Sequence, residues 1–352
     1  MKTKNLIIFT SALALMAAIV ALTSHQPRSR SYELSGQPVL PHSVTGQISK
    51  IEVTEKNSPN PIVLEKKDGG LWRITSYHNA PANLTRIAKL TDDLENSKIQ
   101  RIVTANPERF ERLGLGARTV TFFNEHQQEI FKISLGNTSP DGGYYLKIPN
   151  SDSALEAHPQ VFFSANPDEW LARELFQFKI EDITSLTFQL SNQTPVRFQR
   201  DEQGKWQLLE PQLPEGRNLK NDMPESLLRL ILGINIYQHN LITDPQSQAA
   251  LAHSRKIEFT LKDGNTVSLS VGRAPAEKSA DDSTAPNTNP VLVFLQKAPE
   301  AYVWSEAART IIPHATETLY KQIPNSIDEM LAAPTPEETA QQQPLISPEP
   351  AD

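Results

Sequence analysis

Apolar and polar residues alternate with the period of a β-strand in two long stretches of the chain. The first, ISKIEVTEKNSPNPIVLEKKDGGLWRIT, begins at Ile48, and the second, ITSLTFQLSNQTPVRFQRDEQGKWQLLE, begins at Ile183. In each, a turn with Asp and Gly precedes a tryptophan, and Trp72 and Trp206 lie 134 residues apart (206 − 72 = 134). We therefore expect a strand hairpin at both places, with each tryptophan filling the core of its own half.

A second pair of matching stretches follows the first. VTFFNEHQQEIFKISLGN from Val120 matches IEFTLKDGNTVSLSVGR from Ile257, and Gly136 and Gly272 lie 136 residues apart (272 − 136 = 136). A rougher match joins VFFSANPDEWLARELF, from Val161, to YVWSEAARTIIPHATETLY, from Tyr302. A nearly constant offset, with insertions confined to loops, is typical of an internal repeat.

Helical spacing of apolar residues follows each hairpin. In NLTRIAKLTDDLEN, one face carries Leu84, Ile87, Leu90 and Leu94, and Asn83 is placed to cap the helix. In DMPESLLRLILGI, Pro224 suits a first helical turn and Gly233 an end. Each unit then reads as a hairpin, a helix, a second set of strands and a closing helix.

Successive hairpins with two helices per unit favour an α+β fold with mostly antiparallel sheet. We expect a tandem duplication of this sheet-plus-helices unit, over residues 47–180 and 181–330. Between the strands of the second unit, APAEKSADDSTAPNTNP from Ala274 is small, polar and proline-bearing, which predicts a mobile loop.

The N-terminus predicts a membrane anchor. An uncharged, mostly apolar run covers residues 6–23 after Lys2 and Lys4, and a spanning helix needs about 20 such residues. A cleaved signal peptide is the alternative, but Ala21-Leu22-Thr23 is a poor cleavage site. The positive-inside rule favours residues 1–5 in the cytoplasm and an exported, periplasmic body.

Two further segments lack the periodicity of helices or strands. Residues 24–46 contain prolines and serines and read as a tether. Residues 331–352 are proline-rich and acidic, with few large apolar side chains, so we expect a disordered tail.

Composition narrows the class of partner. The 352 residues carry a formal net charge of −7 and a mean hydropathy of −0.42. This suits a body of about two domains and, without a basic stripe, argues against a nucleic-acid partner. The absence of cysteine excludes disulfides, thiolate nucleophiles and zinc–thiolate sites.

The Gly-x-Gly at Gly114 and Gly116 resembles a phosphate-binding loop, but its context is wrong. Such a loop must follow a strand and open a helix, so that free N–H groups point at the anion. Here the glycines follow the helical turn NPERFERL and precede the strand TVTFF. We read Gly114 as a left-handed stop for that turn.

Other catalytic and metal-binding patterns are also missing from the sequence. There is no Gly-x-Ser-x-Gly, and the eight histidines (25, 42, 78, 126, 158, 239, 253 and 314) are scattered, with His126 in a hairpin turn. The acidic pairs Asp92-Asp93, Glu181-Asp182 and Asp281-Asp282 consist of adjacent residues, which point apart. Asp141-Gly142-Gly143 lacks the spaced oxygens of a calcium loop. The sequence therefore assigns no catalytic, cofactor-binding or metal-binding residue.

Several segments together resemble the bacterial domain of unknown function 4340. They are NPERFERLGL, SLGNTSPDGGYYLKI and the tryptophan after the double glycine, and the resemblance is best from about Ile48 to Pro211. It implies a membrane-anchored envelope protein and, through genomic setting, an auxiliary of ABC-type export or gliding systems. The second unit departs from the pattern, because HNLITDPQSQAALAHS lacks the Glu-Arg-x-Gly-Leu element.

Two functional hypotheses follow. The leading one is a non-enzymatic accessory or scaffold of a membrane transport complex, held by one N-terminal helix in the inner membrane. The alternative is a module that binds an envelope polymer or a small ligand at the seam between the units, since domain junctions favour clefts.

Overall fold

The computed structural model describes residues 34–149, 151–159, 164–220, 222–276, 288–299 and 302–332. The expected cytoplasmic end (1–5) and membrane segment (6–23), residues 24–33 of the tether, residues 277–287 of the insertion and residues 333–352 lie outside this range. Among the residues described, we find no helix long and apolar enough to cross a membrane.

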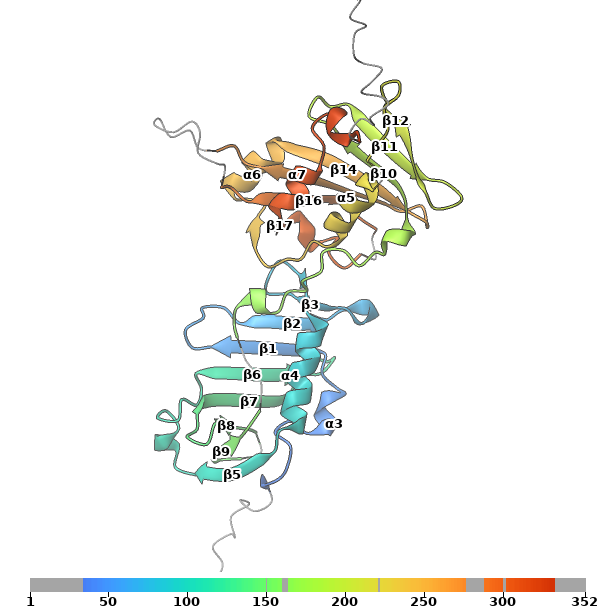
Figure 1. Cartoon of the computed structure of the whole chain (residues 1–352). Helices are drawn as coiled ribbons and strands as arrows, with labels where there is room; N and C mark the ends of the chain where they lie inside the picture. The colour runs from blue at the N-terminus through green and yellow to red at the C-terminus, as the bar shows by residue number, and fades with distance from the viewer. Residues whose placement is uncertain are drawn as a thin grey trace, which may run out of the picture. The chain divides into compact units, whose positions relative to one another are not determined.

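The chain's internal contacts divide it into two units (Figure 1). The first unit takes the chain up to Tyr77 together with Leu84–Trp170, and the second takes His78–Asn83 and the chain from Leu171 on. The elements of the first unit are α3 (His42–Thr45), β1 (Lys50–Glu55), β2 (Ile62–Lys66), β3 (Trp72–Ile74), α4 (Leu84–Asn96), β5 (Ile99–Thr104), β6 (Arg118–Phe123), β7 (Glu129–Thr138), β8 (Tyr144–Lys147) and β9 (Ala154–Ala157).

The second unit begins with a short segment taken from the first half of the sequence. Its elements are β4 (Ala80–Pro81), β10 (Ile183–Gln189), β11 (Pro195–Arg200), β12 (Trp206–Glu210), α5 (Met223–Leu232), β13 (His239–Leu241), α6 (Pro245–Ala252), β14 (Ser254–Leu261), β15 (Thr266–Arg273), β16 (Val291–Lys297), β17 (Ile311–Ala315) and α7 (Glu317–Gln322). Ala82 bridges Leu171, and the Pro81 carbonyl accepts a hydrogen bond from the Ala172 N–H at 2.9 Å.

Each unit contains one mostly antiparallel sheet, so the expected α+β class is confirmed. Among the strands that belong to the first unit the order is β3-β2-β1-β6-β7-β8-β9-β5, and the second sheet runs β12-β11-β10-β14-β15-β16-β17-β13. Matched in chain order, these two sets of eight strands have the same order. The hairpins expected from Ile48 and Ile183 form β1–β2 and β10–β11.

The first helix of each unit buries an equivalent face. In α4, which crosses the strands of its sheet (Figure 1), the buried residues are Ile87, Leu90, Thr91 and Leu94. In α5 the equivalent buried residues are Pro224, Leu227, Leu228 and Ile231, each 137 positions later (for example, 227 − 90 = 137), and Met223 is buried in addition. As expected, Pro224 lies in the first turn of α5 and Gly233 follows its last residue. The expected burial of Leu84 is wrong: its side chain, at the start of α4, is 53% exposed.

The units close with similar short turns, but at positions other than those expected. The sequence match between Val161 and Tyr302 is wrong, because β17 interrupts the second stretch. Instead, Asp-Glu-Trp-Leu-Ala at 168–172 corresponds to Asp-Glu-Met-Leu-Ala at 328–332. Each adjoins a 3-10 turn, Pro167–Glu169 or Asp328–Met330. The leucine of each turn then bridges a residue a few positions before a long helix in the sequence, as Leu171 bridges Ala82, before α4, and Leu331 bridges Leu219, before α5.

The tryptophans of the cores are not the ones expected. Trp72 and Trp206 begin the equivalent strands β3 and β12, but both are only half-buried. Trp206 stacks against the guanidinium of Arg200, 4.5 Å from its ring centre. The cores instead enclose Trp170 and Trp304 almost completely. Trp206 lies in β12, the end strand of its sheet, where a large ring has neighbours on one side only.

Gly136 and Gly272 allow the backbone to pass unusually close to a preceding turn. A Cβ on Gly136 would lie 2.3 Å from the carbonyl oxygen of Leu113, and one on Gly272 would lie 2.2 Å from that of Ala250. In the first unit the same Leu113 oxygen accepts the N–H of Asn137 at 2.8 Å. The repeated glycine is therefore explained by a repeated backbone contact, in which the neighbouring atom belongs to the main chain.

We predict that Gly136→Ala and Gly272→Ala each lower the free energy of unfolding by about 3 kcal/mol, the upper part of the usual range for overpacking, because a backbone carbonyl cannot rotate away. Urea denaturation followed by tryptophan fluorescence measures this. Gly46→Ala is the control: Gly46 has a helical φ of −67° and nothing within 4 Å of its Cβ position, so it should be neutral or slightly stabilising. Equal effects at all three positions would contradict the explanation.

Candidate functional site

The Gly-x-Gly loop binds the protein's own backbone and side chains. Gly114 and Gly116 have left-handed φ values of 71° and 89°, and both precede β6. The N–H of Gly116 donates to Ser134 Oγ at 2.7 Å, and the N–H of Gly114 donates to the Glu111 carbonyl at 2.9 Å. These donors are thus already engaged within the fold.

The structure brings a few of the other residues weighed from sequence together: Asp141 and His158 both approach the Arg101–Glu156 pair, and His239 lies near His314. His126 is exposed in the turn between β6 and β7, and Asp93 forms an ion pair with Lys89 at 2.8 Å. The pair Asp281-Asp282 lies outside the described residues. Across the described ranges, no group of three or more His, Asp or Glu side chains is placed to hold a metal ion.

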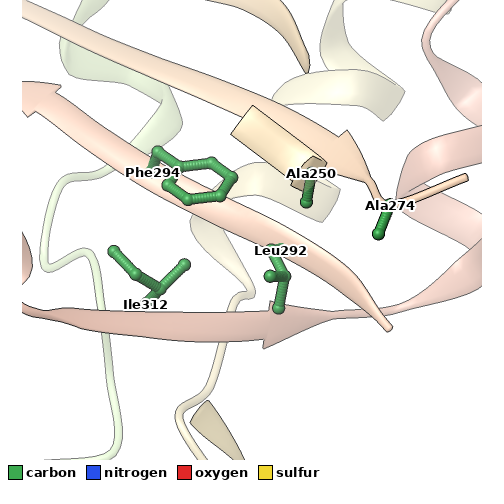
Figure 2. Close-up of a cluster of buried hydrophobic side chains, with 5 residues drawn as sticks. All are labelled: Ala250, Ala274, Leu292, Phe294 and Ile312. Atoms are coloured by element: carbon green, nitrogen blue, oxygen red, sulfur yellow. The ribbon is translucent and has the colours of Figure 1, made fainter. Parts of the chain in front are cut away.

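A helix seals one face of the second sheet. In Figure 2, Ala250 of α6 lies over Leu292 and Phe294 of β16, with Ile312 of β17 on the neighbouring strand. Ala274, at the end of β15, completes this buried cluster. Burial of these side chains removes apolar surface from water and fixes α6 on the sheet.

The corresponding face of the first sheet is polar. Ser134 pairs with Lys147, and Ser270, the equivalent serine two residues before the strand glycine, pairs with Phe294. Lys147 therefore takes the place of Phe294, and its ammonium lies 5.1 Å from the ring centre of Phe110. A turn that follows the 3-10 segment Pro107–Arg109 stands in this unit where the second has α6.

A buried carboxylate lies on this polar face. Glu156 of β9 is only 1% exposed, and Arg101 Nη2 of β5 lies 2.7 Å from its Oε2. Neither carboxylate oxygen has a hydrogen bond of good geometry, so the positive charge compensates it by proximity. Asp141 lies 3.8 Å from the same guanidinium, and His158 Nε2 lies 4.0 Å from Glu156 Oε1. The cluster is a charged latch between β5, β9 and the turn before β8.

A hydrogen-bond chain occupies the equivalent place in the second unit. Glu156 pairs with Tyr145, and His314 pairs with Leu292, so His314 corresponds to Glu156. His314 Nε2 donates to Asn240 Oδ1 at 2.7 Å, and the donors then continue through Gln246 to Asn289. Asn289 donates to the carbonyls of Ala274 and Pro275. Burial, followed by the charge of His239, holds the pKa of His314 below its ordinary value.

A groove of about 530 Å³ lies at the end of α5 in the second unit. Its buried apolar residues are Ile234 and Leu319, with Leu230 half-buried beside them. Its exposed rim includes Arg229, Tyr237, Gln238 and Thr316. The volume falls within the usual range for ligand sites, roughly 300–1,000 Å³.

Local structure shapes the groove. Gly233 ends α5, and the chain then runs extended, with the Ile236 N–H donating to the Arg173 carbonyl at 2.7 Å. On the opposite wall, Thr316 caps α7 by accepting the Leu319 N–H. Arg255 holds the far end of α7, donating to the carbonyls of Tyr320 and Ile323.

Tyr237 is the most exposed of the large hydrophobic residues described, at 72%. The guanidinium of Arg173 lies 5.5 Å from its ring centre and also donates to the Ile236 carbonyl at 2.8 Å. The described residues that line the groove include one arginine and no carboxylate. Tyrosine and arginine are among the residue types enriched at the energetic centres of protein interfaces.

Sequence reasoning missed these residues. Glu156 stands alone among apolar residues in Ala-Leu-Glu-Ala at 154–157, and a single carboxylate in such a strand signals a buried charge. Tyr237 gave no comparable signal, because its exposure depends on how α5 ends and on the backbone hydrogen bonds that residues 234–236 then form with residues 173–175.

Comparison with known proteins gives one match. A family model described as a domain of unknown function (DUF4340) matches residues 72–252. This is 181 of 352 residues (252 − 72 + 1 = 181), from β3 to α6, and so extends further into the second unit than the resemblance read from sequence. No curated protein and no solved structure matches.

We predict that Arg101→Met lowers the free energy of unfolding by about 2 kcal/mol, because Glu156 would stay buried without its cation. The figure is below that for a fully buried pair, since the Arg101 side chain is 56% exposed. The double variant Arg101→Met/Glu156→Leu should recover most of the loss, and Lys89→Met, which breaks a surface pair, should change little. A double variant as unstable as Arg101→Met would contradict this role of the Arg101–Glu156 pair. Urea denaturation measures all three.

We predict that the stability of the second unit falls as pH drops below about 6.5, the ordinary pKa of histidine. Because the folded pKa of His314 is lowered, the unfolded chain binds more protons in this window. The contribution of His314 to stability is therefore fully present above this pH window and is lost as pH falls through the folded pKa. His314→Asn should flatten the pH dependence of urea denaturation between pH 7 and 5. His126→Asn, in an exposed turn, should leave it unchanged; an equal effect of both would contradict the assignment.

Proposed function

This chain belongs to the family described as a domain of unknown function (DUF4340), and from that premise we propose that it is a non-enzymatic, membrane-anchored protein that binds a protein partner. The groove beside Tyr237 is the proposed binding surface. The partner is a subunit of a membrane complex of the ABC transport type, with which this protein acts as an accessory or scaffold outside the cytoplasm.

The exposure of Tyr237 is the observation that carries the proposal. A tyrosine ring at 72% exposure leaves apolar area in water that a partner would cover. Arg173 stacks beside it, and Ile234 and Leu319 offer an apolar floor. Buried aromatic and arginine anchors surrounded by weaker contacts supply most of the affinity of protein interfaces.

The groove's own chemistry favours a protein segment as occupant. It is an open channel between the end of α5 and the start of α7, with amide and hydroxyl groups of Asn235, Gln238 and Thr316 in or near the rim. Such groups adapt to backbone donors and acceptors, while the apolar floor takes one or two aliphatic side chains.

The N-terminal sequence supports the location. Residues 6–23 have the length and composition of a single membrane helix, and the cations at Lys2 and Lys4 favour a body on the periplasmic side. The resemblance to envelope proteins near ABC-type systems points to the same compartment.

We also infer that the two units are tandem copies of one module. The shared strand order, the equivalent buried faces of α4 and α5, and the Asp-Glu-x-Leu-Ala turns all support this. Only the second copy would then carry the partner groove, because its Tyr237 has no aromatic counterpart at Gln100, 137 positions earlier (237 − 137 = 100).

Co-purification tests the function. The full chain, tagged and extracted from its host membrane in mild detergent, should bring down the permease or ATPase subunit of an ABC-type complex, quantified by mass spectrometry. Tyr237→Ala should lower this recovery at least tenfold, since loss of an interface anchor costs about 2 kcal/mol or more.

Leu209→Ala is the matched control, because Leu209 is another exposed large hydrophobic residue of the same unit, at 50%, and lies outside the groove. The amount of partner recovered with Leu209→Ala should equal the amount recovered with the unaltered chain. Recovery that survives Tyr237→Ala, or that contains no membrane-complex subunit, would contradict the proposal.

A further inference from the structure

The described residues that line the groove are mostly apolar, amide or hydroxyl side chains. The cation among them, Arg229, is paired with Glu225 on α5, with 2.6 Å between Arg229 Nη2 and Glu225 Oε1, and Arg173 lies beside Tyr237. The apolar floor and the Tyr237 ring therefore determine which ligand fits. A segment with aliphatic side chains and proline complements this surface.

Residues 333–352 of the same chain have this composition. They contain four carboxylates and no lysine or arginine, and five of the twenty residues are proline. Their two large aliphatic side chains, Leu345 and Ile346, stand together in Pro-Leu-Ile-Ser-Pro-Glu-Pro at 344–350. Proline-rich segments bind grooves lined by aromatic rings because little conformational entropy is lost.

The described chain ends close to the helix that leads to the groove. The Ala332 N–H donates to the Asn218 carbonyl at 2.8 Å, and Arg217 Nη2 donates to the Ala332 carbonyl at 3.2 Å. Leu331 bridges Leu219, four residues before α5. Ala332 is thereby fixed beside the segment that enters α5, whereas the groove lies at the other end of that helix.

The distance is within reach. A helix of ten residues is about 15 Å long, and thirteen residues separate Ala332 from Leu345 (345 − 332 = 13), which span up to about 45 Å when extended. The intervening chain is therefore long enough to pass along α5 and to follow the surface on its way.

We propose that residues 344–350 bind the Tyr237 groove of their own chain and compete there with the partner. Leu345 and Ile346 contact the floor formed by Leu230, Ile234 and Leu319. The neighbouring prolines pack on the Tyr237 ring. The identity of the competing partner rests on the proposed function. The binding of the segment to the groove does not depend on that function.

Competition within one chain needs little intrinsic affinity. A short tether gives an effective concentration in the millimolar range. A segment with a dissociation constant of about 0.1 mM would then weaken partner binding about tenfold. A partner therefore displaces the segment only if its own affinity for the groove is high enough.

Photo-crosslinking of the full chain tests the proposal. A benzophenone amino acid at Gln238, an exposed rim residue, should crosslink to peptides containing residues 344–350. Leu345→Asp/Ile346→Asp should reduce the crosslink at least tenfold, because charges cannot enter the apolar floor. Gln341→Asp/Gln342→Asp adds the same charge just outside the proposed segment and should leave it unchanged. The probe at Gln207, exposed on β12, should give no crosslink to this segment.

Each outcome decides a separate point. Absence of the crosslink, or its survival in Leu345→Asp/Ile346→Asp, overturns the inference. A crosslink between isotopically light and heavy chains in a mixed sample also overturns it, because the occupant would then be a second copy. If the crosslink forms as expected but partner recovery ignores Tyr237→Ala, the segment binding stands and the proposed function fails. If both hold, Leu345→Asp/Ile346→Asp should raise partner recovery severalfold.

Discussion

A close contact between two backbone segments organises both units. In each, a strand glycine, Gly136 or Gly272, passes beneath the carbonyl of the turn or helix that precedes the unit's second set of strands. Any side chain at that position would meet main-chain atoms, so the contact requires glycine in both units. It fixes the height of the Leu113 turn and of α6 above their sheets. The other differences between the units surround this shared backbone contact.

The units differ most on the sheet face that this contact borders. In the second unit, α6 packs Ala250 on Leu292 and Phe294, and the face becomes a second apolar core. In the first unit, a turn replaces the helix, and the equivalent strands carry Lys147 and Glu156. Glu156 is then buried against a single arginine, an arrangement that costs desolvation and contributes orientation between strands more than stability. One strand order therefore supports an apolar core in one unit and a charged latch in the other.

The groove of the second unit follows from how its long helix ends. Gly233 stops α5, and the following residues pair with Arg173–Leu175, which turns Tyr237 outwards beside the Arg173 guanidinium. The cap of α7 at Thr316 closes the other side. The proposed partner site thus depends on backbone features of the fold, whereas its specificity depends on a few side chains. In the proposed competition, residues 344–350 contact the same side chains and raise the affinity that a partner needs in order to bind.

The sequence by itself determined the periodic features: the paired hairpins, the apolar faces of α4 and α5, the repeated glycines and the strand context of Gly114. These depend on local periodicity and on backbone conformation, which neighbouring residues set. Only the tertiary structure decided which tryptophans fill the cores, why Gly136 and Gly272 recur, and that Ala82 joins Leu171. It also decided that Glu156 meets Arg101 and that Tyr237 faces solvent. Each of these depends on segments far apart in the chain, and burial at such meetings is set by three-dimensional packing that no local pattern encodes.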